Sequence, residues 1–259
     1  MRWHERDHPR RPDGRFRRKG ASGGWIEAVS DQISRGHSPA RGRDIRDEID
    51  PTWPVPRGER GEPDLALGRI AEMQGFTGTP EVVDRAEMDR RVAAGWPEMW
   101  RGVSDYTVRE SDNVGSRTRT VTAEENTEQF RSGDYYPGVG IFGSGTYASV
   151  DPDTALGYVS GSLGEDYAST PGIARIALRP DARTVDFDEL LEQYPDLAAA
   201  RRPGDRAVLQ DVGRLAAALG YDAISIRPRN PAHLAASPRR IMYYAILNRT
   251  AVAVQEASR

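Results

Sequence analysis

Residues that can form a hydrophobic core are spread unevenly along this chain, and this limits where a folded domain can lie. Between Ser34 and Pro63 the sequence is dominated by Arg, Gly, Asp and Pro and offers little to bury. Such a segment cannot offset the entropy lost on folding, so a linker is predicted here. The folded domain is expected to occupy residues 64–259, which is long enough for one domain with its own core.

The first 63 residues are predicted to form a basic, largely disordered arm. Residues 1–20 contain eight basic and three acidic side chains, although the whole chain has a formal net charge of −3. Residues 20–24 are typical of a hinge, and apolar residues at helical spacing predict a short helix near 25–33. The basic arm either contacts an acidic partner or nucleic acid, or is a solvated terminus without a partner.

The composition excludes several kinds of active site. The chain has no cysteine, and Lys19 is its only lysine. Thiolate nucleophiles, cysteine zinc sites, P-loops and Schiff-base enzymes are therefore excluded from the predicted domain, and no metal site is expected. Of the four histidines only His233 lies after residue 37, so a Ser-His-Asp triad would depend on that residue, which lies in a proline-bounded loop.

Hydropathy gives no sign of membrane insertion. No window approaches about 18 consecutive apolar residues, and no apolar region follows the basic N-terminus as in a secretory signal. We therefore expect no membrane partner and a cytoplasmic protein, or a virion-associated one if the chain is encoded by a phage.

Periodicity and capping residues predict helices and strands in mixed order. Thr122 followed by Glu125 forms a capping box before an amphipathic run. Helices early and short strands later favour an α+β domain with a mixed, mainly antiparallel sheet and flanking helices. The predicted helices are 64–73, 84–94, 123–130, 187–194 and 206–219, and the predicted strands are 99–103, 173–178, 222–226 and two runs within 241–254.

The string Gly138-Val-Gly-Ile-Phe-Gly143 has the spacing G-x-G-x-x-G without the context of a dinucleotide fingerprint. Residues 134–137 precede it where a strand is required, and Gly145-Thr-Tyr147 follows it where a helix should begin. The glycines either let the backbone approach a ligand or supply positive φ in turns.

Two tyrosines follow the glycines. Tyr147 lies on a predicted strand, and Tyr158, eleven residues later, lies on a predicted short helix. Two rings arranged in this way can hold a flat heteroaromatic ring by offset stacking, although two core tyrosines would give the same pattern.

Four segments of the chain together resemble the ADP-ribosyltransferase superfamily over residues 95–255. Tyr147 and Tyr158 match, in identity and spacing, the tyrosine pair of the diphtheria-toxin and poly-ADP-ribose-polymerase branch. Arg101 is similar to the first-motif arginine of the other large branch. The resemblance implies a split β-sheet and cleavage of the nicotinamide–ribose bond of NAD. The segments are Trp100-Arg-Gly-Val103, residues 138–158, Gly220-Tyr-Asp-Ala-Ile224 and Tyr243-Tyr-Ala-Ile-Leu-Asn248.

The resemblance also implies a role for each matching residue. The backbone of Gly102 would hydrogen-bond the nicotinamide carboxamide, and Arg101 would contact the phosphate or adenosine side of NAD. Tyr147 and Tyr158 would sandwich the nicotinamide ring. The remaining residues expected to line the NAD site are Gly145, Thr146 and Ser149.

The chain departs from the family pattern at its last motif. Family enzymes usually carry a glutamate there, which holds a ribose hydroxyl and stabilises the oxocarbenium-like cation. Here Tyr243 stands in that place. Either another acid substitutes, with Asp222, Glu128 and Glu256 as candidates, or the site works without one, or the domain is catalytically weak.

The resemblance favours a mono-ADP-ribosyltransferase with NAD as co-substrate and a macromolecular acceptor, protein rather than nucleic acid. One alternative is an NAD glycohydrolase, which needs the same pocket but no acceptor surface. Another is an inactive phage structural or interaction module that retains the fold. The order of basic arm, linker and domain is similar to transferase modules attached to actinobacterial-phage head proteins or deployed as toxins.

Overall fold

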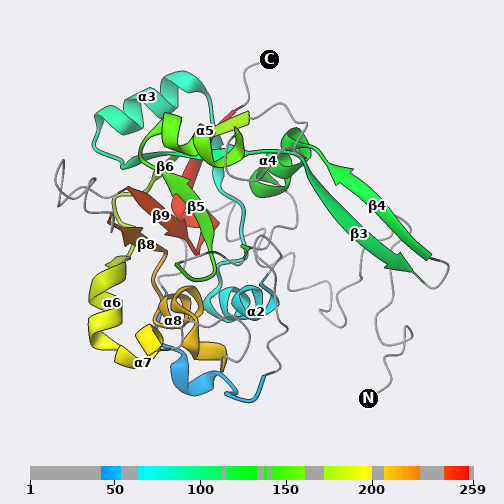
Figure 1. Cartoon of the computed structure of the whole chain (residues 1–259). Helices are drawn as coiled ribbons and strands as arrows, with labels where there is room; N and C mark the ends of the chain where they lie inside the picture. The colour runs from blue at the N-terminus through cyan, green and yellow to red at the C-terminus, as the bar shows by residue number, and fades with distance from the viewer. Residues whose placement is uncertain are drawn as a thin grey trace, which may run out of the picture. The chain divides into compact units, whose positions relative to one another are not determined.

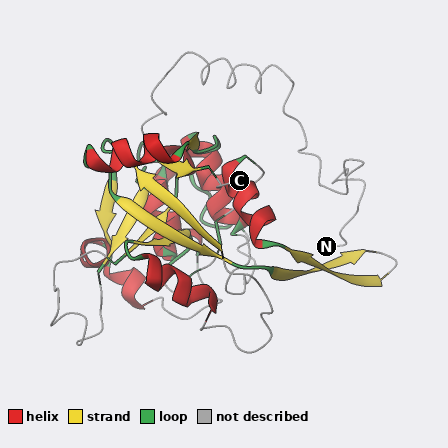
Figure 2. Ribbon diagram, turned by 90° about the horizontal axis from the view of Figure 1, so that it is seen from above, coloured by secondary structure: helices red, strands yellow, loops and turns green. Residues whose placement is uncertain are grey.

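The structure, a computed structural model, contains an α+β domain. It describes residues 42–53, 64–112, 115–132, 137, 138, 140, 142–160, 172–199, 207–227 and 242–256, all within one compact unit, Pro39–Arg259. The predicted basic region, hinge and helix near 25–33 lie outside these residues. Helices surround a mixed, mainly antiparallel sheet (Figures 1 and 2), so the expected fold class is confirmed.

The main sheet has eight strands in the order β1-β10-β6-β2-β5-β9-β8-β7. The edge pairs β1–β10 and β8–β7 are parallel, and every pair between them is antiparallel. In sheet order the strands are β1 (Glu81–Val83), β10 (Val252–Gln255), β6 (Gly172–Leu178), β2 (Glu98–Val103), β5 (Thr146–Ser149), β9 (Tyr243–Ile246), β8 (Ala223–Ile226) and β7 (Thr184–Asp186).

Side-chain caps explain where the early helices begin. Asp64, Asp84 and Thr122 each accept a hydrogen bond from an amide in the first turn that follows, and Thr122 and Glu125 form the predicted capping box. The helices are α2 (Leu65–Gln74), α3 (Arg85–Ala93), α4 (Ala123–Arg131), α5 (Pro152–Ser160), α6 (Phe187–Gln193), α7 (Pro195–Ala199) and α8 (Val212–Ala218), with 3-10 turns η2 (Arg46–Glu48), η3 (Val208–Gln210) and η4 (Arg249–Ala251).

Three clusters of apolar side chains hold the helices to the sheet. The largest joins α2, α6 and α8 to β8 and β9, and a small one joins α3 to β10 and β6. The third cluster lies on the opposite face of the sheet and includes Phe130 of α4, Met99 of β2 and Ala148 of β5. Burial of this apolar area is the main favourable term in folding.

Part of the predicted linker belongs to the folded unit. Ile45 and Ile49 are only 1% and 5% exposed and join the cluster of α2 and α8. The Ile45 amide donates to the carbonyl of Ala218 (2.8 Å). Gly42 and Gly220 approach so closely that a Cβ on Gly220 would lie 2.4 Å from the carbonyl carbon of Gly42. The folded unit therefore includes residues 42–53.

The predicted helix over 206–219 is wrong in its first part. Val208–Gln210 form the 3-10 turn η3, and α8 begins only at Val212. Asp211 is extended and accepts a hydrogen bond from the Arg214 amide (3.0 Å). An aspartate cap at this position starts a new helix and prevents a continuous one.

Some elements were not predicted. A ribbon of β3 (Tyr106–Asp112) and β4 (Gly115–Val121) projects from the rest of the domain in both Figure 1 and Figure 2. Its two strands pair only with each other. The short strands β1 and β7 and the helix α7 were also missed.

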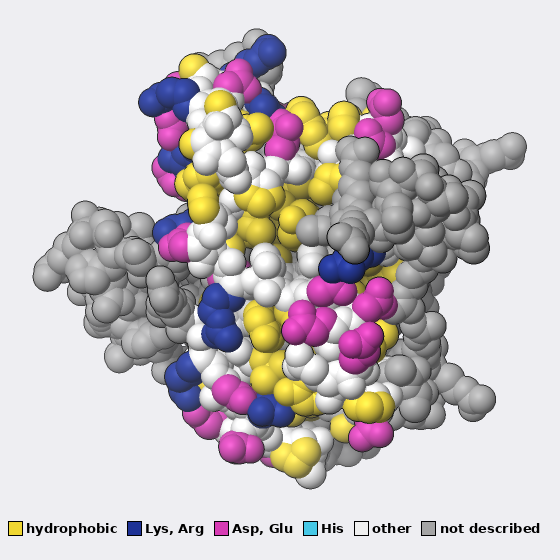
Figure 3. Space-filling model, turned by 90° about the vertical axis from the view of Figure 1, so that its left-hand side faces the viewer, with side chains coloured by type: hydrophobic (Ala, Val, Ile, Leu, Met, Phe, Trp, Pro, Cys, Tyr) yellow, Lys and Arg dark blue, Asp and Glu magenta, His cyan; other side chains and the backbone are white. Residues whose placement is uncertain are grey.

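Charged side chains of both signs are interspersed over the side of the molecule in Figure 3, and hydrophobic side chains gather between them. This mixture agrees with the small net charge of the chain. None of the helices that the structure describes is long and apolar enough to cross a membrane.

Asp64 and Arg214 form a buried ion pair between the beginnings of α2 and α8. Their side chains are 1% and 7% exposed, and both Nε and Nη2 of Arg214 lie 2.7 Å from Oδ2 of Asp64. The second carboxylate oxygen accepts from the Leu67 amide (3.0 Å). Removing one partner would leave a buried charge without compensation.

We predict that Asp64→Asn lowers the free energy of unfolding by about 3–5 kcal/mol, measured by urea denaturation, because the Arg214 guanidinium loses its counter-charge. Asp181→Asn is the matched control, since Asp181 pairs with Arg179 at 3.0 Å but its side chain is 47% exposed. The control is expected to lose less than about 1 kcal/mol. Equal losses in the two variants would contradict the prediction.

Candidate functional site

The eight-stranded sheet is nearly divided between β2 and β5. These neighbouring strands share one residue pair, Trp100 with Ser149. The next two positions in this register, Arg101 with Ala148 and Gly102 with Tyr147, are not paired. Two half-sheets, β1-β10-β6-β2 and β5-β9-β8-β7, therefore meet at a single pair, and we call the place where Gly102 and Tyr147 face each other the β2–β5 opening.

The backbone of Gly102 is directed toward this opening. The Leu178 amide donates to the carbonyl of Pro97 (2.9 Å). Pro97 and Leu178 lie opposite each other in the β2–β6 register, so they are a hydrogen-bonded pair of this ladder. Bonded and non-bonded pairs alternate along an antiparallel ladder. The N–H and C=O of Gly102 consequently point away from β6, toward β5.

The backbone of Tyr147 is directed toward the opening from the other side. The Val150 amide donates to the carbonyl of Met242 (3.0 Å), in register with the β5–β9 ladder. By the same alternation, the N–H and C=O of Tyr147 point away from β9, toward β2. Gly102 and Tyr147 thus present backbone donors and acceptors to each other across the opening.

Helix α5 packs directly on Gly102. A Cβ on Gly102 would lie 2.2 Å from the carbonyl oxygen of Ala155 and 3.2 Å from Cγ1 of Val159. Glycine is therefore required here for helix packing, whether or not a ligand also uses its backbone. Tyr158 belongs to α5, so the structure brings its helix to Gly102, but its side chain lies outside the described residues.

Arg101 lies on the opposite face of β2 from Gly102, because successive side chains in a strand alternate. Its guanidinium is 5.3 Å from the ring centre of Phe130 on α4, and Nη2 donates to Asn126 (3.4 Å). Tyr147 instead shares the face of Gly102, since Trp100 pairs with Ser149. The structure therefore brings Gly102 and Tyr147 together and places the Arg101 side chain elsewhere.

The glycine-rich loop wraps around the ring of Tyr147. The Tyr147 hydroxyl donates to the carbonyl of Gly143 (2.6 Å) and accepts from the Phe142 amide (3.0 Å). A Cβ on Gly140 would lie 2.2 Å from Cε2 of this ring, and Gly143 has φ +103°. Ring contact and positive φ thus account for these two glycines without a ligand.

The other expected NAD contacts are built into the strand and the turns around it. The Gly145 amide donates to the carbonyl of Gly138 (2.9 Å). Thr146 is buried and lies on the face opposite Tyr147. The Ser149 hydroxyl is also buried, donates to the carbonyl of Met242 (3.3 Å) and accepts from the Asp151 amide (3.1 Å).

Tyr243 lies beside Ser149 on β9 and shares the face of Tyr147. None of the three candidate acids lies at this end of β9. Asp222 accepts from Asn248 Nδ2 (2.7 Å) at the other end of the strand. Glu128 belongs to α4 and bonds Ser132, and Glu256 follows β10, three strands away from β5.

Sequence reasoning missed Asp151, an acid two residues after the end of β5. Its Oδ2 accepts from the Thr154 amide (2.9 Å), so it caps the first turn of α5. The signal that could have identified it is the sequence Asp-x-x-Thr before a helix. Tyr244 follows Tyr243 on β9 and lies on the opposite face of the sheet, where burial raises the pKa of its hydroxyl.

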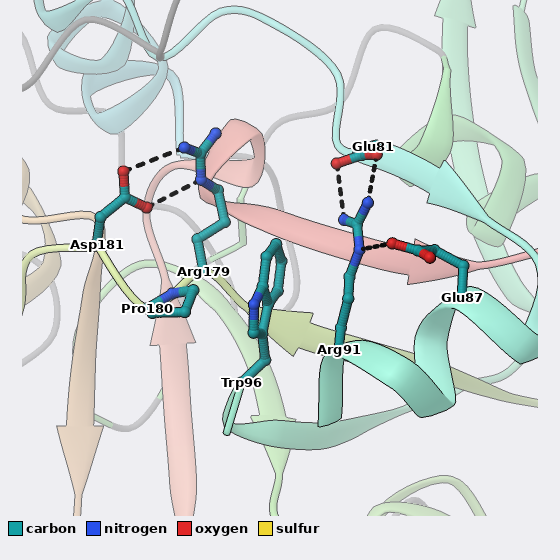
Figure 4. A pocket seen from close by; sticks show the side chains of 7 residues that line it. All are labelled: Glu81, Glu87, Arg91, Trp96, Arg179, Pro180 and Asp181. Carbon is teal, nitrogen blue, oxygen red and sulfur yellow. Dashed lines mark hydrogen bonds and ion pairs between the residues drawn. The ribbon is translucent and has the colours of Figure 1, made fainter. Parts of the chain in front are cut away.

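A hollow of about 600 Å³ lies away from the opening, around Trp96 (Figure 4). Arg91 there bonds both Glu81 oxygens (2.6 and 2.7 Å) and Glu87 (2.6 Å). These hydrogen bonds raise the pKa of Arg91 and lower that of Glu81. Arg179 pairs with Asp181 (3.0 Å) on the far side of Trp96. The cations in this hollow are therefore already matched with acids.

The part of the chain that the structure describes has no group of three or more His, Asp or Glu residues that could hold a metal ion. Comparisons of the chain with protein-family models, with curated proteins and with solved structures give no match.

We predict that Gly102→Ala destabilises the domain by about 1–3 kcal/mol, because the new methyl group pushes the α5 backbone off β2. Gly157→Ala is the matched control in the same helix, where a Cβ meets nothing within 4 Å. The control is expected to gain about 0.5–1 kcal/mol from higher helix propensity. Thermal denaturation of both variants measures the difference, and a neutral Gly102→Ala would show that α5 packs differently.

Proposed function

We propose that the β2–β5 opening binds the nicotinamide end of NAD and that the protein is a mono-ADP-ribosyltransferase. The observation that carries the proposal is the position of Gly102 opposite Tyr147, with the helix of Tyr158 packed on Gly102. These are the positions that the sequence resemblance assigns to carboxamide and ring binding. A backbone N–H and C=O together complement the two polar atoms of a carboxamide.

Each residue at the opening would have its own role in binding NAD. Gly102 would hold and orient the carboxamide through its backbone, and Tyr147 and Tyr158 would contact the ring. Because the Arg101 side chain lies on the other face of β2, in contact with Phe130 and Asn126 of α4, we do not assign it the expected contact with the phosphate or adenosine side of NAD. When bound, NAD supplies the reactive nicotinamide–ribose bond and the ADP-ribose group for transfer.

The lack of a carboxylate at the last motif favours weak catalysis. Tyr243 supplies no carboxylate, Asp151 after β5 caps α5, and Asp222 bonds Asn248 at the other end of β9. A carboxylate at this point would stabilise positive charge that develops on the ribose. Its absence also supports the second candidate function, a module that retains the fold and binds without turnover.

We predict that the purified chain releases nicotinamide from NAD and transfers labelled ADP-ribose to a protein in a lysate. Tyr147→Ala should reduce both by at least about tenfold, since stacking on an aromatic side chain is worth roughly 1–3 kcal/mol. Tyr194→Ala is the control, because Tyr194 packs against the same core cluster as Tyr147 but from the end of α6.

The outcomes of this assay separate the alternatives. Release without labelled protein would identify an NAD glycohydrolase, and binding of NAD without release would identify the inactive module. A chain that neither binds NAD by calorimetry nor releases nicotinamide would overturn every NAD-dependent function.

We predict that Tyr243→Glu raises the rate of nicotinamide release by about tenfold or more, because it places a carboxylate at the last motif. Tyr243→Gln is the matched control, because glutamine has nearly the same shape as glutamate but carries no charge. Equal rates for the two variants would show that this position on β9 does not face the reacting ribose.

A further inference from the structure

The loop before β5 is bound to the beginnings of two helices. Ser144 is fully buried, and its amide donates to both carboxylate oxygens of Asp211 (3.0 and 3.2 Å). Its hydroxyl donates to Oδ2 of Asp64. Since Asp64 caps α2 and Asp211 caps α8, one serine connects the loop to both helices.

The approach of the loop to α8 leaves little room for movement. A Cβ on Gly213 would lie 1.7 Å from the carbonyl oxygen of Ser144, and one on Gly143 would lie 2.7 Å from the Gly213 amide nitrogen. Arg214 adds its ion pair with Asp64 from the same turn of α8. Loop and helix therefore meet at backbone contact distance around a buried polar network.

The same loop holds Tyr147 at its other end. The carbonyl of Gly143, next to Ser144, accepts from the Tyr147 hydroxyl (2.6 Å). The Phe142 amide donates to the same hydroxyl (3.0 Å). The ring also rests on Gly140. The orientation of the Tyr147 ring thus depends on the loop, and the loop depends on Asp64, Ser144 and Asp211.

We propose that Ser144, held by Asp64 and Asp211, is a positioning residue for Tyr147. This inference rests on the proposed function, in which Tyr147 contacts nicotinamide. Stacking depends on the plane of the ring, so a loop that samples other positions reduces the fraction of molecules ready to bind. The apparent dissociation constant rises by the inverse of that fraction.

Ser144→Ala is the test variant. It removes the hydroxyl, while Asp64 keeps Arg214 and the Leu67 amide as partners. The dissociation constant for NAD, measured by calorimetry, is expected to rise about tenfold, as when the binding-competent loop falls to roughly a tenth of the population. Hydrogen exchange at the Phe142 amide, measured by NMR, is expected to become at least several-fold faster.

Thr122→Ala is the control, because it also removes a single hydroxyl. The Thr122 hydroxyl accepts from the Glu125 amide (3.1 Å) at the start of α4, whereas the Ser144 hydroxyl donates to Asp64. It should lower thermal stability without changing the NAD constant or the Phe142 exchange rate. An equal rise in the constant for both variants, or an unchanged constant in Ser144→Ala, would overturn the inference.

A second variant keeps the test decisive if Ser144→Ala does not fold. Tyr147→Phe removes the other end of the same connection and keeps the ring, so it should weaken NAD binding to a similar extent. Where both fold, their combination should cost no more than either alone, since coupled residues are not additive. Additive losses would contradict a shared role.

The NAD and exchange measurements distinguish two kinds of failure. If the wild-type chain does not bind NAD, the proposed function fails and this inference fails with it. If the wild type binds NAD and Ser144→Ala speeds Phe142 exchange without weakening binding, only the positioning role is overturned.

Discussion

The buried ion pair between Asp64 and Arg214 is the interaction on which much of this domain depends. It joins residues that lie 150 positions apart in the sequence, at the beginnings of α2 and α8. An ionised pair without solvent is stable only when its remaining donors and acceptors are also satisfied. Leu67 and Ser144 donate to the Asp64 carboxylate, and Asp211 accepts from the backbone amide of Arg214, so the ion pair, the two helix caps and the loop before β5 form one interdependent unit.

The geometry of the candidate site follows from this unit and from the weak junction between the half-sheets. The loop determines where β5 begins and where the Tyr147 ring lies. On the other side, α5 can approach β2 only because Gly102 has no side chain. The sheet stays open beyond Trp100 and Ser149, and the two strands turn backbone groups toward each other there.

The sequence was informative where the signal was local. Thr122 with Glu125, and the aspartates at 64 and 84, each satisfy a nearby amide, so the starts of three helices were predictable. Local signals failed where distant contacts decide. Ile45 and Ile49 stand in a polar stretch, and only their contact with α2 and α8 makes them core residues. The β3–β4 ribbon was missed as well, and its two strands pair with each other and with no other described strand.

The candidate site shows the same limit. The tyrosine spacing placed Tyr147 on a strand and Tyr158 on a helix, and both elements are confirmed. The face on which Arg101 lies relative to Tyr147 depends on the pairing of Trp100 with Ser149, which no local pattern specifies. The roles of Gly140 and Gly143 likewise depend on a ring and a helix that come later in the chain.

The position of β10 has a consequence for how the chain folds. This strand, residues 252–255, lies between β1 and β6, whose residues are made much earlier. Until β10 has left the ribosome, β1 has no strand to pair with and one edge of β6 stays exposed. Pairing across such sequence distances is slow and leaves unpaired edges prone to aggregation. The half-sheet that carries Gly102 is therefore completed only once Val252–Gln255 have been synthesised, and synthesis that stops before Val252 would leave it unfinished.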